Sequence, residues 1–95
     1  MIFAFVYTPG SAWIPGKGAE EQPFFEEHVR YMQQLFDDKR LLMGGPLLDH
    51  ESGLGILEVE NEAQARELIE HDPAVLGKLF QPQLHPWHPA FNQYA

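Results

Sequence analysis

Apolar side chains recur with two different periods along the chain, and the changes between these periods predict its elements. Residues 2–7 are β-branched and aromatic and end at a Thr-Pro-Gly turn signal, which predicts a strand. Because this run has little polar alternation, we expect the strand to be buried on both faces and central in its sheet. Residues 9–19 hold the prolines and glycines of a loop, which also carries Trp13 and Ile14.

The middle of the chain predicts a helix followed by a hairpin. Apolar residues recur at helical spacing over 25–36, and Pro23 suits the first turn of that helix. Residues 41–48 then predict a strand. Residues 54–60 predict a second strand, whose alternation between apolar and polar side chains indicates one solvated face.

The last third predicts a second helix and a final strand. Asn61 followed by Gln64 fits a capping box, and a helix from there is expected to stop at Asp72-Pro73, because proline disfavours helical geometry in the residue before it. Residues 79–87 are extended, but their two prolines restrict them to an edge or irregular strand.

The order β-α-β-β-α-β predicts an α+β fold of the ferredoxin-like type, a four-stranded antiparallel sheet with two helices on one face. The 95 residues suit a single domain over 1–95. A domain of this size buries only about 60–70% of the surface of its unfolded chain. The free face of the sheet needs cover, so we expect a homodimer that pairs through this open sheet face.

Composition narrows the classes of function. The chain has no cysteine, which excludes a disulfide scaffold, a thiolate metal site and a cysteine nucleophile. It carries 14 acidic against 6 basic residues, a net charge of -8, so we expect no binding to nucleic acid or to an anionic membrane. No apolar run approaches the ~20 residues of a membrane span, and we expect a cytoplasmic protein.

Histidine and aspartate are the remaining candidates for chemistry. His28 lies on the apolar stripe of the first predicted helix, and there a core histidine bound to a carbonyl group is the plainer interpretation. The functional interpretation is a general acid/base, which needs a carboxylate to hold its tautomer. Asp72 falls on the inward stripe of the second helix and is the natural partner, although Asp before proline also caps its own turn. Both helices on one face would bring the two side chains into one layer.

Other features predict the surroundings of such a site. Gly44-Gly45-Pro46 interrupts a predicted strand, which indicates either a bulge or the close approach of a ligand at a sheet edge. From their place in the chain, Tyr7, Trp13 and Phe5 are candidates for its apolar walls. His85 and His88 do not converge in an extended segment, so we expect no metal site.

The same residues resemble the YciI-like, or YCII-related, family. The resemblance rests on the histidine of the first helix, the segment Arg40-Leu41-Leu42-Met43-Gly44-Gly45-Pro46-Leu47, the segment Asp72-Pro73-x-Val75, and a last strand that reaches Pro86-Trp87. It covers nearly the whole chain. Three features depart from the family pattern. Phe25 stands where many members have arginine, the glycine that follows Asp72-Pro73 is shifted by one to Gly77, and the loop over 9–22 is longer and more aromatic.

The resemblance implies a ferredoxin-like domain of the dimeric α+β-barrel superfamily, with a His–Asp dyad formed by His28 and Asp72 in a pocket beside the sheet. It also implies lyase or dehydrohalogenase-type chemistry on a small cyclic molecule. Our leading hypothesis is therefore an acid/base enzyme with catalytic His28 and Asp72, with Gly44, Gly45, Pro46, Tyr7 and Trp13 as substrate-binding residues, and with no cofactor or metal. The alternative is a non-catalytic module that binds a small ligand or a regulatory partner, in which the pair is structural.

Overall fold

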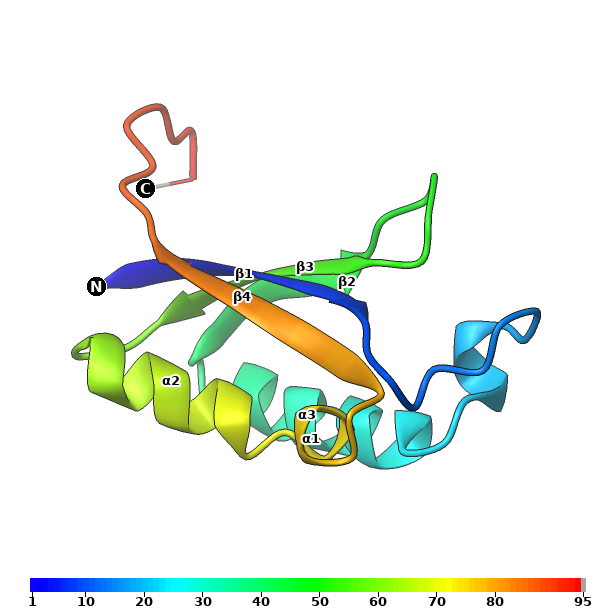
Figure 1. The fold of residues 1–95 in the computed structure, drawn as a ribbon. Coiled ribbons are helices and arrows are strands. Elements are labelled where there is room, and N and C mark those ends of the chain that lie inside the picture. Colours follow the sequence, from blue (N-terminus) through cyan, green and yellow to red (C-terminus); the bar gives the residue numbers. More distant parts are fainter. Residues whose placement is uncertain (95) are drawn as a thin grey trace.

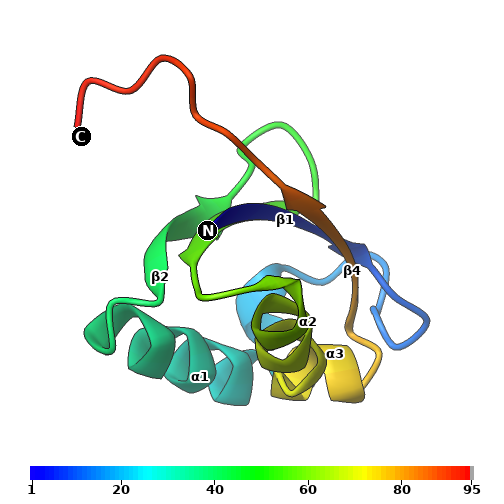
Figure 2. The same cartoon turned by 90° about the vertical axis from the view of Figure 1, so that its left-hand side faces the viewer.

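The computed structural model describes residues 1–94 as a four-stranded antiparallel sheet with its helices packed on one face (Figures 1 and 2). The strands are β1 (Ile2–Pro9), β2 (Leu41–Pro46), β3 (Gly53–Glu58) and β4 (Phe80–Pro86), in the spatial order β2-β3-β1-β4. The helices are α1 (Phe25–Asp37), α2 (Glu62–Glu70) and α3 (Pro73–Leu76), and the short 3-10 helix η1 (Ala19–Glu21) precedes α1. The predicted α+β, ferredoxin-like fold is confirmed.

Strand β1 is central, as its apolar sequence predicts. Phe3, Phe5 and Tyr7 alternate along it, face the helices and are almost fully buried. The side chains between them, such as Ala4 and Val6, point to the open face of the sheet and are only half-buried. The expected burial on both faces therefore holds for one face of the isolated chain.

Helix α1 begins two residues later than Pro23 suggests. Phe24 caps it in the left-handed conformation, with φ 66°, and its carbonyl accepts the first helical hydrogen bond from the His28 N–H at 2.9 Å. The ring of Phe24 lies against Gly77, where a Cβ atom would be only 2.6 Å from the ring carbons. A glycine at this position lets the start of α1 approach the end of α3 closely.

The apolar stripe of α1 serves two surfaces, not one core. Leu35 is the one residue of this helix that is fully buried, whereas Val29 and Phe36 are 47% and 54% exposed. Both side chains line a cleft between α1 and the β2–β3 hairpin. The helix follows the predicted spacing, and Val29 and Phe36 on its apolar stripe face the cleft.

The β2–β3 hairpin carries two irregular features. The pairing register shifts between Leu41 and Met43, whereas Gly44, Gly45 and Pro46 pair regularly with β3. The bulge that we expected at Gly44-Gly45-Pro46 therefore lies earlier in β2. On β3, Gly55 gives room to the ring of Phe5, since a Cβ atom there would lie 2.1 Å from the Phe5 Cζ. Both edge strands, β2 and β4, are those that the prolines indicated.

Helix α2 begins and ends as predicted. Asn61 Oδ1 accepts the Gln64 N–H at 2.8 Å, and the helix ends at Glu70, just before Asp72-Pro73. A short helix, α3, begins at Pro73 and leads toward β4. Within residues 1–94, no helix combines the length and the apolar character that crossing a membrane requires.

Candidate active site

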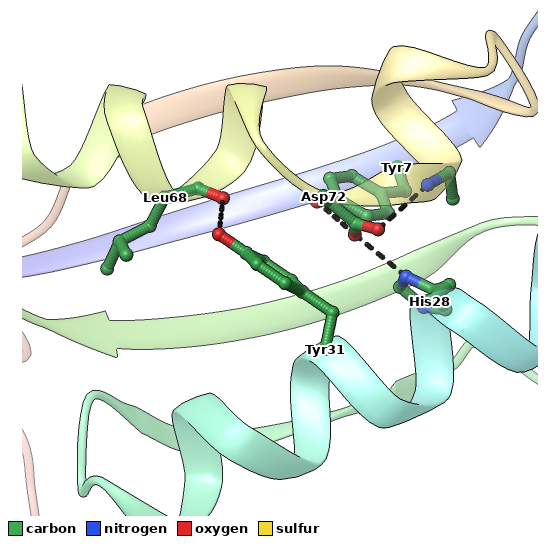
Figure 3. Close-up of polar contacts among 6 residues, drawn as sticks. Tyr7, His28, Tyr31, Leu68 and Asp72 are labelled. Carbon is green, nitrogen blue, oxygen red and sulfur yellow. Dashed lines mark hydrogen bonds and ion pairs between the residues drawn. The ribbon is translucent and has the colours of Figure 1, made fainter.

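His28 and Asp72, 44 residues apart in sequence, are joined by a hydrogen bond (Figure 3). His28 comes from the first turns of α1 and Asp72 from the junction between α2 and α3. The imidazole Nδ1 lies 2.7 Å from Asp72 Oδ2. The Asp72 side chain has no exposed surface, whereas 17% of the His28 side chain is exposed. The sequence-based expectation that these two side chains share one layer is met.

The Asp72 carboxylate accepts three hydrogen bonds. Oδ2 accepts from His28 Nδ1 and from the Tyr7 hydroxyl at 2.9 Å, while Oδ1 accepts from the Ala74 N–H at 2.9 Å. The bond to Ala74 caps α3, which is the structural role that we weighed against a partnership with His28. The two roles are compatible because they use different oxygens. Three donors satisfy a carboxylate that would otherwise be costly to bury.

Tyr7 has a role that its place in the sequence did not reveal. It was expected only as a wall, yet its hydroxyl donates to Asp72 while its ring packs on Phe80 with 5.4 Å between centroids. Burial raises the pKa of the Tyr7 phenol, and the nearby Asp72 charge and their hydrogen bond raise this pKa further. The Tyr7 hydroxyl therefore keeps its proton and donates it to Asp72 in the hydrogen bond. A tyrosine on the buried stripe of a central strand, which must place its hydroxyl on a partner, was the available signal.

A second tyrosine fixes α1 against α2. The Tyr31 hydroxyl donates to the Leu68 carbonyl oxygen at 2.6 Å (Figure 3). Burial raises the pKa of Tyr31, with a further contribution from the charge of Asp72. Tyr31 lies one helical turn after His28, so this bond helps to hold the His28 side of α1 in place.

A cleft of about 830 Å³ opens beside His28. His28 reaches this cleft from α1. The five predicted substrate-binding residues also line it: Tyr7, Trp13, Gly44, Gly45 and Pro46. Phe5, a further candidate, lines it as well. Asp72 does not reach the cleft and stands behind His28. The volume of the cleft lies within the range of small-molecule sites in proteins.

Two further aromatic rings lie beside His28, and the sequence did not single out one of them, Phe80. Phe80 lies edge-on to the imidazole with centroids 5.5 Å apart, and Phe25 lies 6.2 Å from it. Phe80 opens the last strand, so only the pairing of β4 with β1 brings it here. Phe25 precedes His28 by one helical turn, a spacing that places both on one face.

The cleft also has a charged rim. Lys17 and the two glutamates Glu20 and Glu51 are among its lining residues, and all three are exposed. Within residues 1–94, no three His, Asp, Glu or Cys side chains converge on a point where a metal ion would bind.

The geometry assigns different tasks to the two ring nitrogens of His28. With an ionised Asp72, Nδ1 carries the proton that it donates to the carboxylate, so the tautomer leaves Nε2 with a free lone pair. No partner of Nε2 occurs in the described part of the chain, and the exposed edge of the ring faces the cleft. An imidazole held in this way, with a buried carboxylate behind it, has the arrangement that a general base requires.

Comparison with known proteins agrees with this architecture. The model of the YCII-related domain matches residues 1–87. No curated protein matches the sequence. Among solved structures, the chain is similar to 5-chloro-2-hydroxyhydroquinone dehydrochlorinase (TftG) from Burkholderia phenoliruptrix AC1100 in complex with 2,5-dihydroxybenzoquinone, with a TM-score of 0.69 and 21% sequence identity over 93% of this chain and 94% of that one. The match of the domain model over nearly the whole chain shows that this protein belongs to the YCII-related family.

Proposed function

We propose that this protein is a lyase-type enzyme that uses His28 as a general base on a small cyclic molecule bound in the cleft. The observation that carries the proposal is the 2.7 Å contact between His28 Nδ1 and the buried Asp72 Oδ2 at the edge of that cleft. The aromatic walls around His28 suit a ring. The similarity to a dehydrochlorinase supports elimination as the reaction class.

The proposed reaction is an elimination that needs one base and no cofactor. His28 Nε2 takes a proton from a hydroxyl group or carbon of the ring, and the electron pair of the broken bond forms a new double bond. The bond between the ring and its leaving group breaks, and the leaving group departs as an anion. The imidazolium then returns its proton to water. Asp72 holds the tautomer and stabilises the imidazolium charge throughout.

A matched pair of variants tests this proposal. Purified protein is offered a panel of halogenated hydroxy-rings, and halide release is measured for the wild type, His28→Ala and His71→Ala. His71 is exposed at the end of α2, bonds the Glu67 carbonyl oxygen and lies outside the cleft, so its variant controls for the loss of a histidine. We expect turnover to fall by on the order of 10²- to 10⁴-fold in His28→Ala and to stay unchanged in His71→Ala.

Two results would contradict the enzyme proposal. One is turnover that survives in His28→Ala at the level of the wild type. The other is a complete lack of turnover on the panel together with a His28→Ala variant that loses several kcal/mol of stability. The second result supports a binding module in which His28 and Asp72 form a structural pair.

We also propose that two copies of the chain pair through the open face of the sheet. That face carries half-buried and exposed apolar side chains: Ala4, Val6, Met43, Leu54 and Ile56. The segment after β4, with its exposed Phe91, leaves the sheet on the same side (Figures 1 and 2). Apolar patches of this kind mark interfaces.

The solution mass of the protein tests the pairing. Sedimentation should give twice the 10.9 kDa mass of one chain, and Val6→Lys in the middle of β1 should shift it to one chain. Ser11→Lys, in an exposed loop, should leave the mass unchanged. A wild-type protein that sediments as a single chain at micromolar concentration contradicts this part of the proposal.

A further inference from the structure

Trp13 forms one wall of the cleft close to the proposed base. The centroid of its indole lies 6.0 Å from that of the Phe80 ring. The Phe80 ring in turn packs against the rings of His28 and Tyr7, with centroid distances of 5.5 and 5.4 Å. Trp13 belongs to the loop between β1 and α1, a segment rich in glycine and proline. A large ring on such a loop lines a site reproducibly only if the loop itself is held.

The backbone before Trp13 is fixed to the two residues just before β4. The Gly10 N–H donates to the Leu79 carbonyl oxygen at 2.8 Å, and the Ala12 N–H donates to the Lys78 carbonyl oxygen at 2.9 Å. Gly10 is required at this contact, because a Cβ atom there would lie 2.3 Å from the Lys78 oxygen. The loop therefore leaves β1 in a defined direction.

The backbone after Trp13 is fixed by one buried side chain, that of Gln22. Its Oε1 accepts the Ile14 N–H at 2.8 Å, while its Nε2 donates to the Ile14 carbonyl oxygen at 2.8 Å and to the Lys17 carbonyl oxygen at 3.0 Å. Gln22 is only 6% exposed, although glutamine is mostly found on protein surfaces. Three bonds from one amide close residues 14–22 into a compact loop.

The indole makes no hydrogen bond of its own. Trp13 Nε1 is buried and has no partner among the described residues, and such an unpaired donor destabilises the fold. The ring is therefore not anchored through its polar atom. Its position follows from packing and from the two backbone anchors on either side.

We propose that Gln22 is a positioning residue that holds Trp13 as a flat wall of the cleft, and that Trp13 makes the cleft prefer planar rings to saturated ones. A planar ring stacks on an indole over its whole face, whereas the axial hydrogens of a saturated ring prevent such contact. The inference rests on the proposed function only in taking the cleft as the ligand site. It does not depend on the reaction.

Tryptophan fluorescence tests the positioning role without any ligand. In a Trp87→Phe background Trp13 is the one tryptophan of the chain, and acrylamide quenching reports its accessibility. Gln22→Glu keeps the size and the acceptor for the Ile14 N–H but removes both donated bonds, so we expect quenching to rise several-fold. Gln81→Glu, at an exposed position of β4, adds the same charge and should leave quenching unchanged. Equal quenching of Trp13 in all three proteins overturns the positioning role of Gln22.

Binding of phenol and cyclohexanol tests the selection. Affinities are measured by NMR shift titration for the wild type, Gln22→Glu and Trp13→Leu. Trp13→Leu keeps an apolar side chain in the cleft and provides the test if Gln22→Glu fails to fold. We expect the preference of the wild type for phenol to fall by roughly two- to tenfold in both variants. A wild type that binds both alcohols equally overturns the selection and leaves the turnover test of His28 unaffected. Conversely, absent turnover with an intact phenol preference contradicts the proposed function alone.

Discussion

Replacing Tyr7 by phenylalanine removes a single oxygen atom from the interior and tests the network around Asp72. Tyr7 is 3% exposed, and its hydroxyl donates to a carboxylate with no exposed surface. A hydrogen bond to a charged group stabilises a protein by about 1.5–3 kcal/mol. At pH 7 we therefore expect Tyr7→Phe to lower the free energy of unfolding by about that amount, with the packing against Phe5 and Phe80 retained.

The difference between the two proteins should shrink at high pH. The pKa of Tyr7 in the folded state is raised above its ordinary value of 10.0, first by burial and then by Asp72. The stabilisation is thus complete below pH 10 and is lost as pH rises above it, because the unfolded chain releases the phenolic proton and the folded chain keeps it. Between pH 9 and pH 11 the advantage of the wild type should fall by about 1.4 kcal/mol.

Urea unfolding followed by circular dichroism, repeated from pH 7 to pH 11, measures both quantities. Tyr31→Phe is the matched control, because the Tyr31 hydroxyl bonds the Leu68 carbonyl oxygen and not Asp72. That variant should keep the alkaline loss that Tyr7 causes. Parallel curves for the wild type and Tyr7→Phe above pH 10 would refute the reasoning, since they would mean that Tyr7 titrates equally in both states.

Two further predictions concern Asp72 and Gly55. Asp72→Asn should cost about 1–3 kcal/mol in urea unfolding, because the amide keeps one acceptor where three donors meet, and halide release should fall to the level of His28→Ala because the tautomer is no longer held. Full halide release by Asp72→Asn would contradict the orienting role. Gly55→Ala should lower the free energy of unfolding by about 1–3 kcal/mol, and the melting temperature with it, since its Cβ would overlap the ring of Phe5. Gly45→Ala, with no atom within 4 Å of a new Cβ, should be nearly neutral. Equal melting of these two variants would show that Phe5 moves aside without cost.

The architecture was accessible from the sequence because local signals agreed with one another. The apolar run of β1, the Asn61 cap and the proline after Asp72 each define an element boundary by local chemistry. The order of elements then left one plausible sheet. The sequence did not indicate where α1 begins, since the left-handed Phe24 depends on its fit against Gly77, a contact between distant segments.

The candidate site was only partly accessible for the same reason. His28 and Asp72 were identified from their positions on two helical stripes, which is a local property of each helix. The hydroxyl of Tyr7 and the ring of Phe80 reach the site through strand pairing, and the anchor made by Gln22 depends on how a loop of irregular backbone closes. Periodicity contains no information on such contacts. The catalytic roles of His28 and Asp72 stay predictions until the variants are measured.

The two oxygens of Asp72 have different partners, His28 and the Ala74 N–H, and this limits which residues can replace Asp72. A glutamate, one methylene longer, would reach either the Ala74 N–H or the His28 imidazole but would not fit both at their present distances of 2.9 and 2.7 Å. The residue that orients the base also starts a helix. Local fraying of α3 would thus release the tautomer of His28, and the proton-accepting capacity of the protein would report whether that one turn of helix is formed.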